Sequence, residues 1–241
     1  SYVRTRWGDA VADRLVEPLL GGVYAGRADE LSLEATMPAL WAAAVADGPL
    51  PQPAPVTDQA ARPAFAGIIE GMGRLPGLLA DDLTRRGVRV RTSTTVRAVS
   101  TGKERRFSVT VGPTMAEERT LADALVRAPR PTAASRLLAQ LIPEAATALG
   151  EVESSSSAVV TLALPRAGLP GLPGSGFLVP AVDGHVIKGA TFSANKWAWT
   201  DALDPEVTFV RASLGRAGDV RHLQRDDRDL VTIAHHEIGE A

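Results

Sequence analysis

Glu17-Pro18-Leu19-Leu20-Gly21-Gly22-Val23-Tyr24-Ala25-Gly26, closely followed by Leu31-Ser32-Leu33, is the stretch around which the chain is organised. Residues 8–20 place apolar side chains at helical spacing, and Ser32 is a favourable N-cap for a second helix. Because glycine enters the left-handed φ region without penalty, we expect the glycines to make a tight turn between these helices. Pro18 is expected to help end the first helix. Composition alone favours a corner that simply packs.

The bulk composition narrows the class of protein. The chain has 241 residues, of which 45% are hydrophobic, a net charge of −2 and no cysteine. These values favour a folded chain with a sizeable core and argue against nucleic-acid binding by bulk charge. Without cysteine there is no disulfide, thiolate metal site or cysteine nucleophile. No apolar run approaches the roughly 20 residues of a membrane span, so we expect a cytoplasmic protein, with peripheral membrane contact through a helical face left open.

The rest of the chain alternates helical and strand-like patterns. Residues 47–62 are rich in proline and are expected to be irregular. Asp183-Gly184 is predicted to be a hairpin turn, and the apolar strand at 157–164 is expected to be buried on both faces. The predicted helices are 75–86, ended by Gly87, and 133–141, 143–149 and 227–240. The predicted strands are 88–91, 95–99, 106–111, 122–126, 157–164, 177–179, 186–192 and 207–214.

Several common chemistries lack their motifs. No strand is followed by GxGxxG, and there is no P-loop. His235-His236-Glu237 does not have metalloprotease spacing, because the two ligands must recur one helical turn apart. Gly174-Ser175-Gly176 precedes a strand and lacks the outer spacing of a nucleophile elbow. We therefore expect no metal site and no evident catalytic acid or base.

Four blocks together resemble the porphyrinogen oxidases, the FAD-dependent enzymes that make coproporphyrin or protoporphyrin. They are the opening stretch, Gly71–Pro76, Gly174–Pro180, and Ile187–Ser193 with Lys196-Trp197, and they occur in the family's order. The resemblance covers nearly the whole chain but only the middle of the family's usual length. It implies an α/β fold of mixed helices and strands. Residues 66–150 would be part of a FAD-binding domain, interleaved with a substrate domain formed by 1–65 and 151–241, with helices and a mixed sheet.

The resemblance also implies an activity. Hydride would pass stepwise from the tetrapyrrole to the flavin N5 and dioxygen would reoxidise the flavin, in haem biosynthesis. The family's pyrophosphate-binding and C-terminal flavin-binding segments have no counterpart here, so we expect a central portion that is inactive alone. Coproporphyrinogen and protoporphyrinogen both stay open, with a lean to the former. Two alternatives also stay open: a carotenoid desaturase-like enzyme of the same superfamily, and a non-catalytic tetrapyrrole-binding or interaction module.

Site residues follow from the resemblance position by position. Ser175, Gly176 and Leu178 match a segment that touches a pyrrole ring, where missing side chains would leave a wall for a flat ligand. The alternative is a glycine-rich loop that leads into a strand. Val96 matches a valine whose main chain contacts the adenine end of FAD; the alternative is an ordinary strand pair.

Charged residues near these blocks raise two further expectations. Some could attract substrate propionates, although most lysines and arginines are simply solvated. Arg127 and Arg130 stand where the family segment is usually apolar, so we expect them to be exposed or paired with an anion. The candidates for propionate binding are Lys188, Lys196, Arg211 and Arg216.

Overall fold

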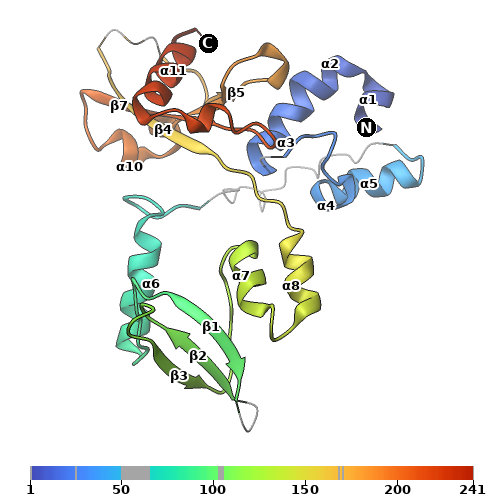
Figure 1. Cartoon of the computed structure of the whole chain (residues 1–241). Helices are drawn as coiled ribbons and strands as arrows, with labels where there is room; N and C mark the ends of the chain where they lie inside the picture. Colours follow the sequence, from blue (N-terminus) through green and yellow to red (C-terminus); the bar gives the residue numbers. More distant parts are fainter. Residues whose placement is uncertain are drawn as a thin grey trace, which may run out of the picture. The chain divides into compact units, whose positions relative to one another are not determined.

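The computed structural model describes residues 2–24, 26–49, 66–102, 106–167, 169 and 171–240. These residues form two compact units, drawn in Figure 1. The first unit joins the described residues up to Met72 to those from Ser155 onward, and the second unit runs Gly73–Ser154. Most of the proline-rich connection predicted at 47–62 lies outside the described residues.

The N-terminal helices of the first unit are α1 (Tyr2–Trp7), α2 (Asp9–Val11), the π-helix η1 (Ala12–Val16) and α3 (Glu17–Tyr24). The predicted glycine turn is wrong, because α3 runs through Gly21 and Gly22 with helical backbone. Pro18 does not end the helix either. It is the second residue of α3, directly after the π-helical turn, where a missing N–H is tolerated.

The second helical segment begins where the sequence predicts it. The Ser32 hydroxyl accepts a hydrogen bond from the Ala35 N–H at 3.3 Å and so caps α4 (Leu33–Thr36). Helix α5 (Pro38–Val45) follows at once, with proline at its first position. No described helix is long and apolar enough to cross a membrane.

A four-stranded sheet forms the centre of the first unit. Its order is β4-β7-β6-β5, and every pairing is antiparallel rather than mixed. Helix α11 (Asp227–Glu240) covers one face, where Leu230 and Ala234 join the sheet's buried side chains. The predicted class of mixed helices and strands is therefore confirmed. The strands are β4 (Ala158–Pro165), β5 (Gly176–Leu178), β6 (Ile187–Phe192) and β7 (Val207–Leu214); short helices are η4 (Ala181–Asp183), α9 (Ser193–Lys196), α10 (Ala198–Asp201) and η5 (His222–Gln224).

Two details of this sheet differ from expectation. Strand β4 is buried on one face only, since Val160 is 7% exposed but Val159 is 51% exposed. A strand of apolar residues is buried on both faces only where other elements pack against both faces of its sheet, and here α11 packs against one face. Strands β5 and β6 do pair, but η4 and Gly184, at φ 78°, connect them instead of a two-residue hairpin.

The second unit contains α6 (Arg74–Arg85), a sheet of order β1-β2-β3, and helices α7 (Pro131–Leu138) and α8 (Pro143–Gly150). Its strands are β1 (Val96–Thr101), β2 (Phe107–Val111) and β3 (Glu118–Ala122), all antiparallel. Gly87 adopts φ 81° just after α6, as predicted.

Two predicted strands of the second unit are wrong. Residues 88–91 are irregular, since no described strand pairs with them. The strand placed at 122–126 instead ends at Ala122, where its ladder with Phe107 ends. Alternation and apolar runs indicate that a segment fits a sheet, but a partner decides whether it becomes a strand.

Candidate functional site

Three of the four sequence blocks meet at Leu178. A Cβ added to Gly22 in α3 would lie 3.2 Å from Leu178 Cδ2, and one added to Gly189 in β6 would lie 3.1 Å from the same atom. Leu178 is still 47% exposed. The side chain is thus held between two backbones while one surface stays open. We call Gly22, Leu178 and Gly189 the Leu178 platform.

The neighbouring residues Ser175 and Gly176 fasten the loop to β6. Gly176 has φ 141°, and a Cβ there would collide with the Ala190 carbonyl oxygen. The Ser175 carbonyl accepts a hydrogen bond from the Phe192 N–H at 3.0 Å. Gly176 is therefore required by the close approach of the two strands. The structure brings both residues beside Leu178, and their contact with a ligand stays a prediction.

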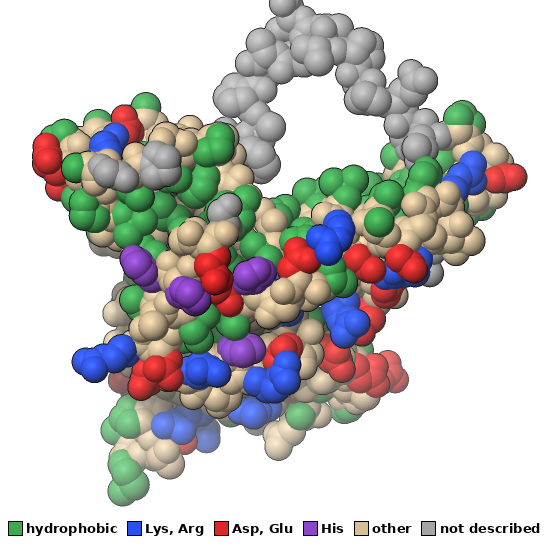
Figure 2. Space-filling model, turned by 90° about the horizontal axis from the view of Figure 1, so that it is seen from above, with side chains coloured by type: hydrophobic (Ala, Val, Ile, Leu, Met, Phe, Trp, Pro, Cys, Tyr) green, Lys and Arg blue, Asp and Glu red, His purple; other side chains and the backbone are tan. Residues whose placement is uncertain are grey.

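A polar cleft lies next to the platform. Its larger part has a volume of about 400 Å³ and is lined by Glu17, Arg27, Arg216 and His222, among others. A smaller hollow of about 20 Å³ shares Glu17, Arg27 and Arg216 with it and also touches Gly22 and Lys188. Figure 2 shows acidic, basic and histidine side chains close together on one face of the molecule.

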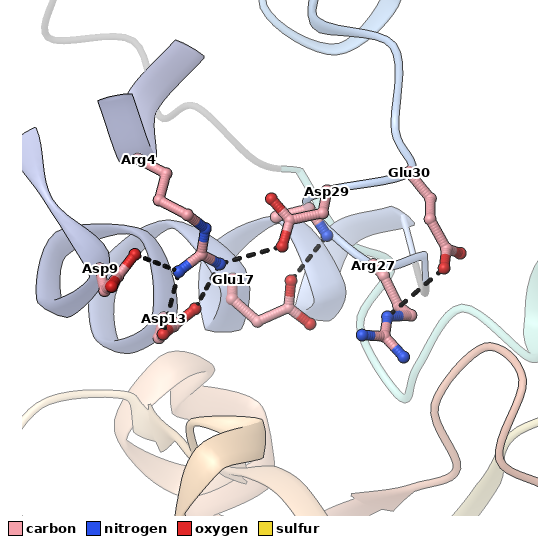
Figure 3. A network of polar contacts seen from close by, with 8 residues as sticks. Arg4, Asp9, Asp13, Glu17, Arg27, Asp29 and Glu30 are labelled. Carbon is pink, nitrogen blue, oxygen red and sulfur yellow. Dashed lines mark hydrogen bonds and ion pairs between the residues drawn. The ribbon is translucent and has the colours of Figure 1, made fainter. Parts of the chain in front are cut away.

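Arg4 anchors one wall of this cleft (Figure 3). Its guanidinium lies 2.8 Å from Asp9, 2.7 Å from Asp13 and 2.9 Å from Asp29, measured to the nearest carboxylate oxygen. The hydrogen bond to Asp13, and then those to Asp9 and Asp29, raise the pKa of Arg4, and Arg4 in turn lowers the pKa of Asp13. Nearby, Glu17 accepts a hydrogen bond from the Ala28 N–H at 2.6 Å. The charged side chains of this wall, Arg4, Asp13, Asp29 and Glu17, are therefore all engaged in contacts within the protein.

Arg216 and Glu237 hold the segment that leads into β6. Arg216 donates hydrogen bonds to the carbonyl oxygens of Val179, His185 and Ile187 at 3.1, 3.1 and 3.2 Å. Glu237 of α11 accepts from the Val186 and Ile187 N–H groups at 3.0 and 2.8 Å. Arg216 is thus engaged with backbone. The sequence offered no signal for Glu237, since it depends on where α11 docks.

Lys188 differs from the other predicted propionate contacts. It is half-buried, and burial, then the nearby Arg216 charge, lower its pKa. It has no ion pair with any residue that the structure describes. Lys196 and Arg211, by contrast, have exposed side chains.

An apolar cavity of about 980 Å³ lies on the α11 side of the sheet. Phe177, Phe192, Val210 and Ile238 line it, and the two phenylalanine rings meet edge to face at 6.0 Å. Its size suits a ligand. The described residues around it include no lysine or arginine, so a polycarboxylate would leave its charges unpaired there.

In the second unit, Val96 begins the edge strand β1. The Gly112 N–H donates to the Thr95 carbonyl at 2.9 Å, and a bulge follows between Val96 and Ala98. By the alternation of an antiparallel ladder, the main chain of Val96 is expected to face away from β2. Val96 as a whole is 42% exposed, and the contact of its main chain with the adenine end of FAD stays a prediction.

The arginines of the second unit correct one expectation. Arg127 is half-buried and donates to the Ala134 carbonyl at 3.1 Å, while its Nη1 is buried without a partner among the described residues. Arg127 is therefore neither exposed nor paired with a described anion, because its guanidinium donates to a backbone carbonyl instead. Arg130 is exposed, as expected.

Comparison with known proteins defines the class. Residues 2–240 match the family of flavin containing amine oxidoreductases, and the chain belongs to that family. It is 33% identical to the coproporphyrinogen III oxidase of Mycobacterium leprae and 34% identical to that of Mycobacterium tuberculosis, with 98% of the chain aligned in both cases. It is 30% identical to the protoporphyrinogen oxidase of Bos taurus over 80% of the chain. The resemblance to porphyrinogen oxidases is therefore confirmed, and the family implies FAD as the cofactor.

A solved structure supports the same relation. A protein from Exiguobacterium sp. 255-15, assigned as a protoporphyrinogen oxidase, superposes with a TM-score of 0.78 over 99% of this chain, at 27% identity. The chain spans about half the length of the curated relatives it matches, and half of that solved chain.

Proposed function

We propose that this protein oxidises a porphyrinogen to the porphyrin with FAD as cofactor and dioxygen as acceptor, in haem biosynthesis. The observation that carries the proposal is the Leu178 platform, where three blocks distant in sequence converge on one half-exposed apolar side chain. A half-exposed apolar side chain beside a polar cleft is the combination of apolar wall and few polar groups that is typical of a ligand site.

The chain's own contribution is binding and orientation. Gly22 and Gly189 let Leu178 pack closely against their backbones, so a flat macrocycle can lie against the exposed side of the leucine. When bound, FAD supplies the hydride-accepting chemistry. The main chain of Val96 would hold its adenine end, while Ser175, Gly176 and Leu178 would face the substrate.

The natural substrate proposed here is coproporphyrinogen. It carries more carboxylates than protoporphyrinogen, and the platform adjoins a polar cleft with Arg27 and Lys188. The mycobacterial relatives named for coproporphyrinogen also align over more of the chain than the bovine one. As part of the proposal, we place the protein in the cytoplasm with a small tetrapyrrole as its partner.

A visible-absorption titration of the purified chain with coproporphyrin, and separately with FAD, tests the proposal. Leu178→Asp should weaken coproporphyrin binding by about tenfold, because it puts a charge against an apolar ring. Leu203→Asp is the matched control, since Leu203 is also exposed, at 57%, and belongs neither to the platform nor to the lining of the polar cleft. Absence of coproporphyrin binding, or equal losses in both variants, would contradict the proposal.

A further inference from the structure

The polar cleft beside the Leu178 platform contains a cation, Lys188, that has no hydrogen bond or ion pair with any described residue. Resting on the function proposed above, we propose that this cleft binds the carboxylates of the tetrapyrrole and that the Lys188 ammonium contacts them directly. The substrate edge that bears its acidic arms would therefore point toward α3 and the beginning of β6.

The charges around the smaller hollow favour an anion. Its described lining contains three cationic side chains, Arg27, Lys188 and Arg216, and one carboxylate, Glu17. A ligand carboxylate would offset this local excess of positive charge and would gain charge-assisted hydrogen bonds. Nucleotide phosphates are a weaker fit, since the same hollow adjoins an apolar leucine platform.

The other charged groups around the hollow each have at least one contact with the described residues. Arg216 directs both terminal nitrogens to backbone carbonyls, and Arg27 lies 3.5 Å from Glu30. Glu17 accepts from the Ala28 N–H. Lys188 has neither a hydrogen bond nor an ion pair with the described part of the chain. A half-buried ammonium group without a partner is stabilised more by a ligand carboxylate than a group that already has partners.

The position of the cleft matches a ligand on the platform. Gly22 belongs to both the platform and the smaller hollow, and Val179 of the hollow directly follows Leu178. The hollow itself is too small for a ring, at about 20 Å³, but it shares Arg27 and Arg216 with the 400 Å³ cavity. A ring on Leu178 can therefore place a carboxylate beside Lys188 at the edge of the larger cavity. The larger cavity itself is lined, among the described residues, by four arginines and four carboxylates, so the excess of positive charge lies at the smaller hollow.

The larger cavity contains a second unsatisfied polar atom. His222 Nδ1 is buried and has no hydrogen-bond partner among the described residues, and His222 lines this cavity together with Arg216 and Arg221. Buried polar atoms are rarely left without a partner. A carboxylate oxygen in the cavity, directly or through water, would accept a hydrogen bond from an Nδ1–H group.

The test compares two probes on the 241-residue chain, coproporphyrin and its tetramethyl ester, which keeps the ring but loses the acids. Lys188→Met should weaken coproporphyrin binding by about tenfold and leave ester binding unchanged. Lys188→Arg should restore most of the affinity for the acid. Lys196→Met is the control, since it removes the same charge from an exposed side chain outside the cleft.

The outcomes separate the two proposals. If neither probe binds, the proposed function fails and this inference fails with it. If both probes bind equally well and Lys188→Met changes neither, the tetrapyrrole site stands and the carboxylate cleft is wrong. If Lys188→Met weakens the acid and the ester alike, Lys188 shapes the site without contacting carboxylates, which also overturns the inference.

Discussion

A Cβ at Gly22 in α3 would lie 3.2 Å from Leu178 Cδ2 in β5, which is tighter than an ordinary van der Waals contact, so a larger side chain at Gly22 would push on Leu178. The first and third sequence blocks therefore pack closely together because residue 22 has no side chain. Gly21 and Gly22 of α3 therefore differ: only Gly22 lies against Leu178, and substitution of each glycine can show the difference.

Gly22→Ala should move Leu178, because the new Cβ would lie 3.2 Å from Leu178 Cδ2. Gly21→Ala should fit, because the atom nearest to its new Cβ, the Gly26 carbonyl oxygen, lies at an ordinary contact distance of 3.6 Å. Both changes favour the helix by about 1 kcal/mol. We expect Gly21→Ala to raise stability by about that amount with coproporphyrin affinity unchanged, and Gly22→Ala to gain less and to bind several-fold more weakly. Equal affinity in the two variants would show that the contact does not shape the platform. Tryptophan fluorescence is a suitable probe, since Trp7, Trp41, Trp197 and Trp199 all lie in the first unit.

Gly176→Ala should unfold the edge of the sheet. The backbone at φ 141° and the collision with the Ala190 carbonyl together predict a loss of about 2–4 kcal/mol. Gly174→Ala is the matched change, because Gly174 has φ 69° but open space around it. It should cost only about 1 kcal/mol in urea unfolding. Similar losses would mean that φ alone, and not the approach of β6, requires glycine at 176.

Lys188→Met should stabilise the protein in a pH-dependent way. The fold lowers the pKa of Lys188 from 10.5, chiefly by burial and then through Arg216. The charged lysine is therefore less favourable in the folded than in the unfolded state, and this cost is fully present below the lowered pKa. The cost disappears as the pH rises through the lowered pKa to 10.5. Thermal melts from neutral pH upward should show the variant's advantage shrinking, whereas a constant difference would point to packing alone.

Glu237→Gln should destabilise the first unit by about 1–3 kcal/mol. The two carboxylate oxygens accept from two separate N–H groups, and an amide offers only one oxygen, so one buried donor loses its partner. Glu240→Gln on the same helix is the control. Its contact with His236, at 3.4 Å, is exposed, so the change should cost less than about 0.5 kcal/mol. Chemical denaturation followed by tryptophan fluorescence measures both, and equal effects would contradict the role given to Glu237.

Val96→Pro tests the predicted cofactor contact. Proline is tolerated at the first residue of an edge strand, but it removes the main-chain N–H. If that group binds adenine, FAD affinity should fall by about tenfold in a flavin-fluorescence titration, while coproporphyrin affinity stays constant. Val96→Ala keeps the main chain and should bind FAD normally. A loss in the alanine variant as large as in the proline variant would assign the contact to the side chain.

Much of the fold could be predicted because its signals are local. The Ser32 cap, the left-handed Gly87 and the amphipathic α11 follow from side chains within one or two helical turns. The segments at 88–91 and 122–126 were wrong because the signal for a strand does not say which segment pairs with it. Helix α3 was misjudged because glycine also serves close packing between elements.

The sequence by itself determined the family, the order of the four blocks and the residue types available for a flat, acidic ligand. Only the tertiary structure decided how they combine: Gly22 and Gly189 lie against Leu178, Arg216 donates to backbone carbonyls, and Lys188 has no partner among the described residues. The physical reason is that burial and unsatisfied donors are properties of surroundings. Those surroundings are formed by segments far apart in the chain, so a local sequence pattern does not predict them.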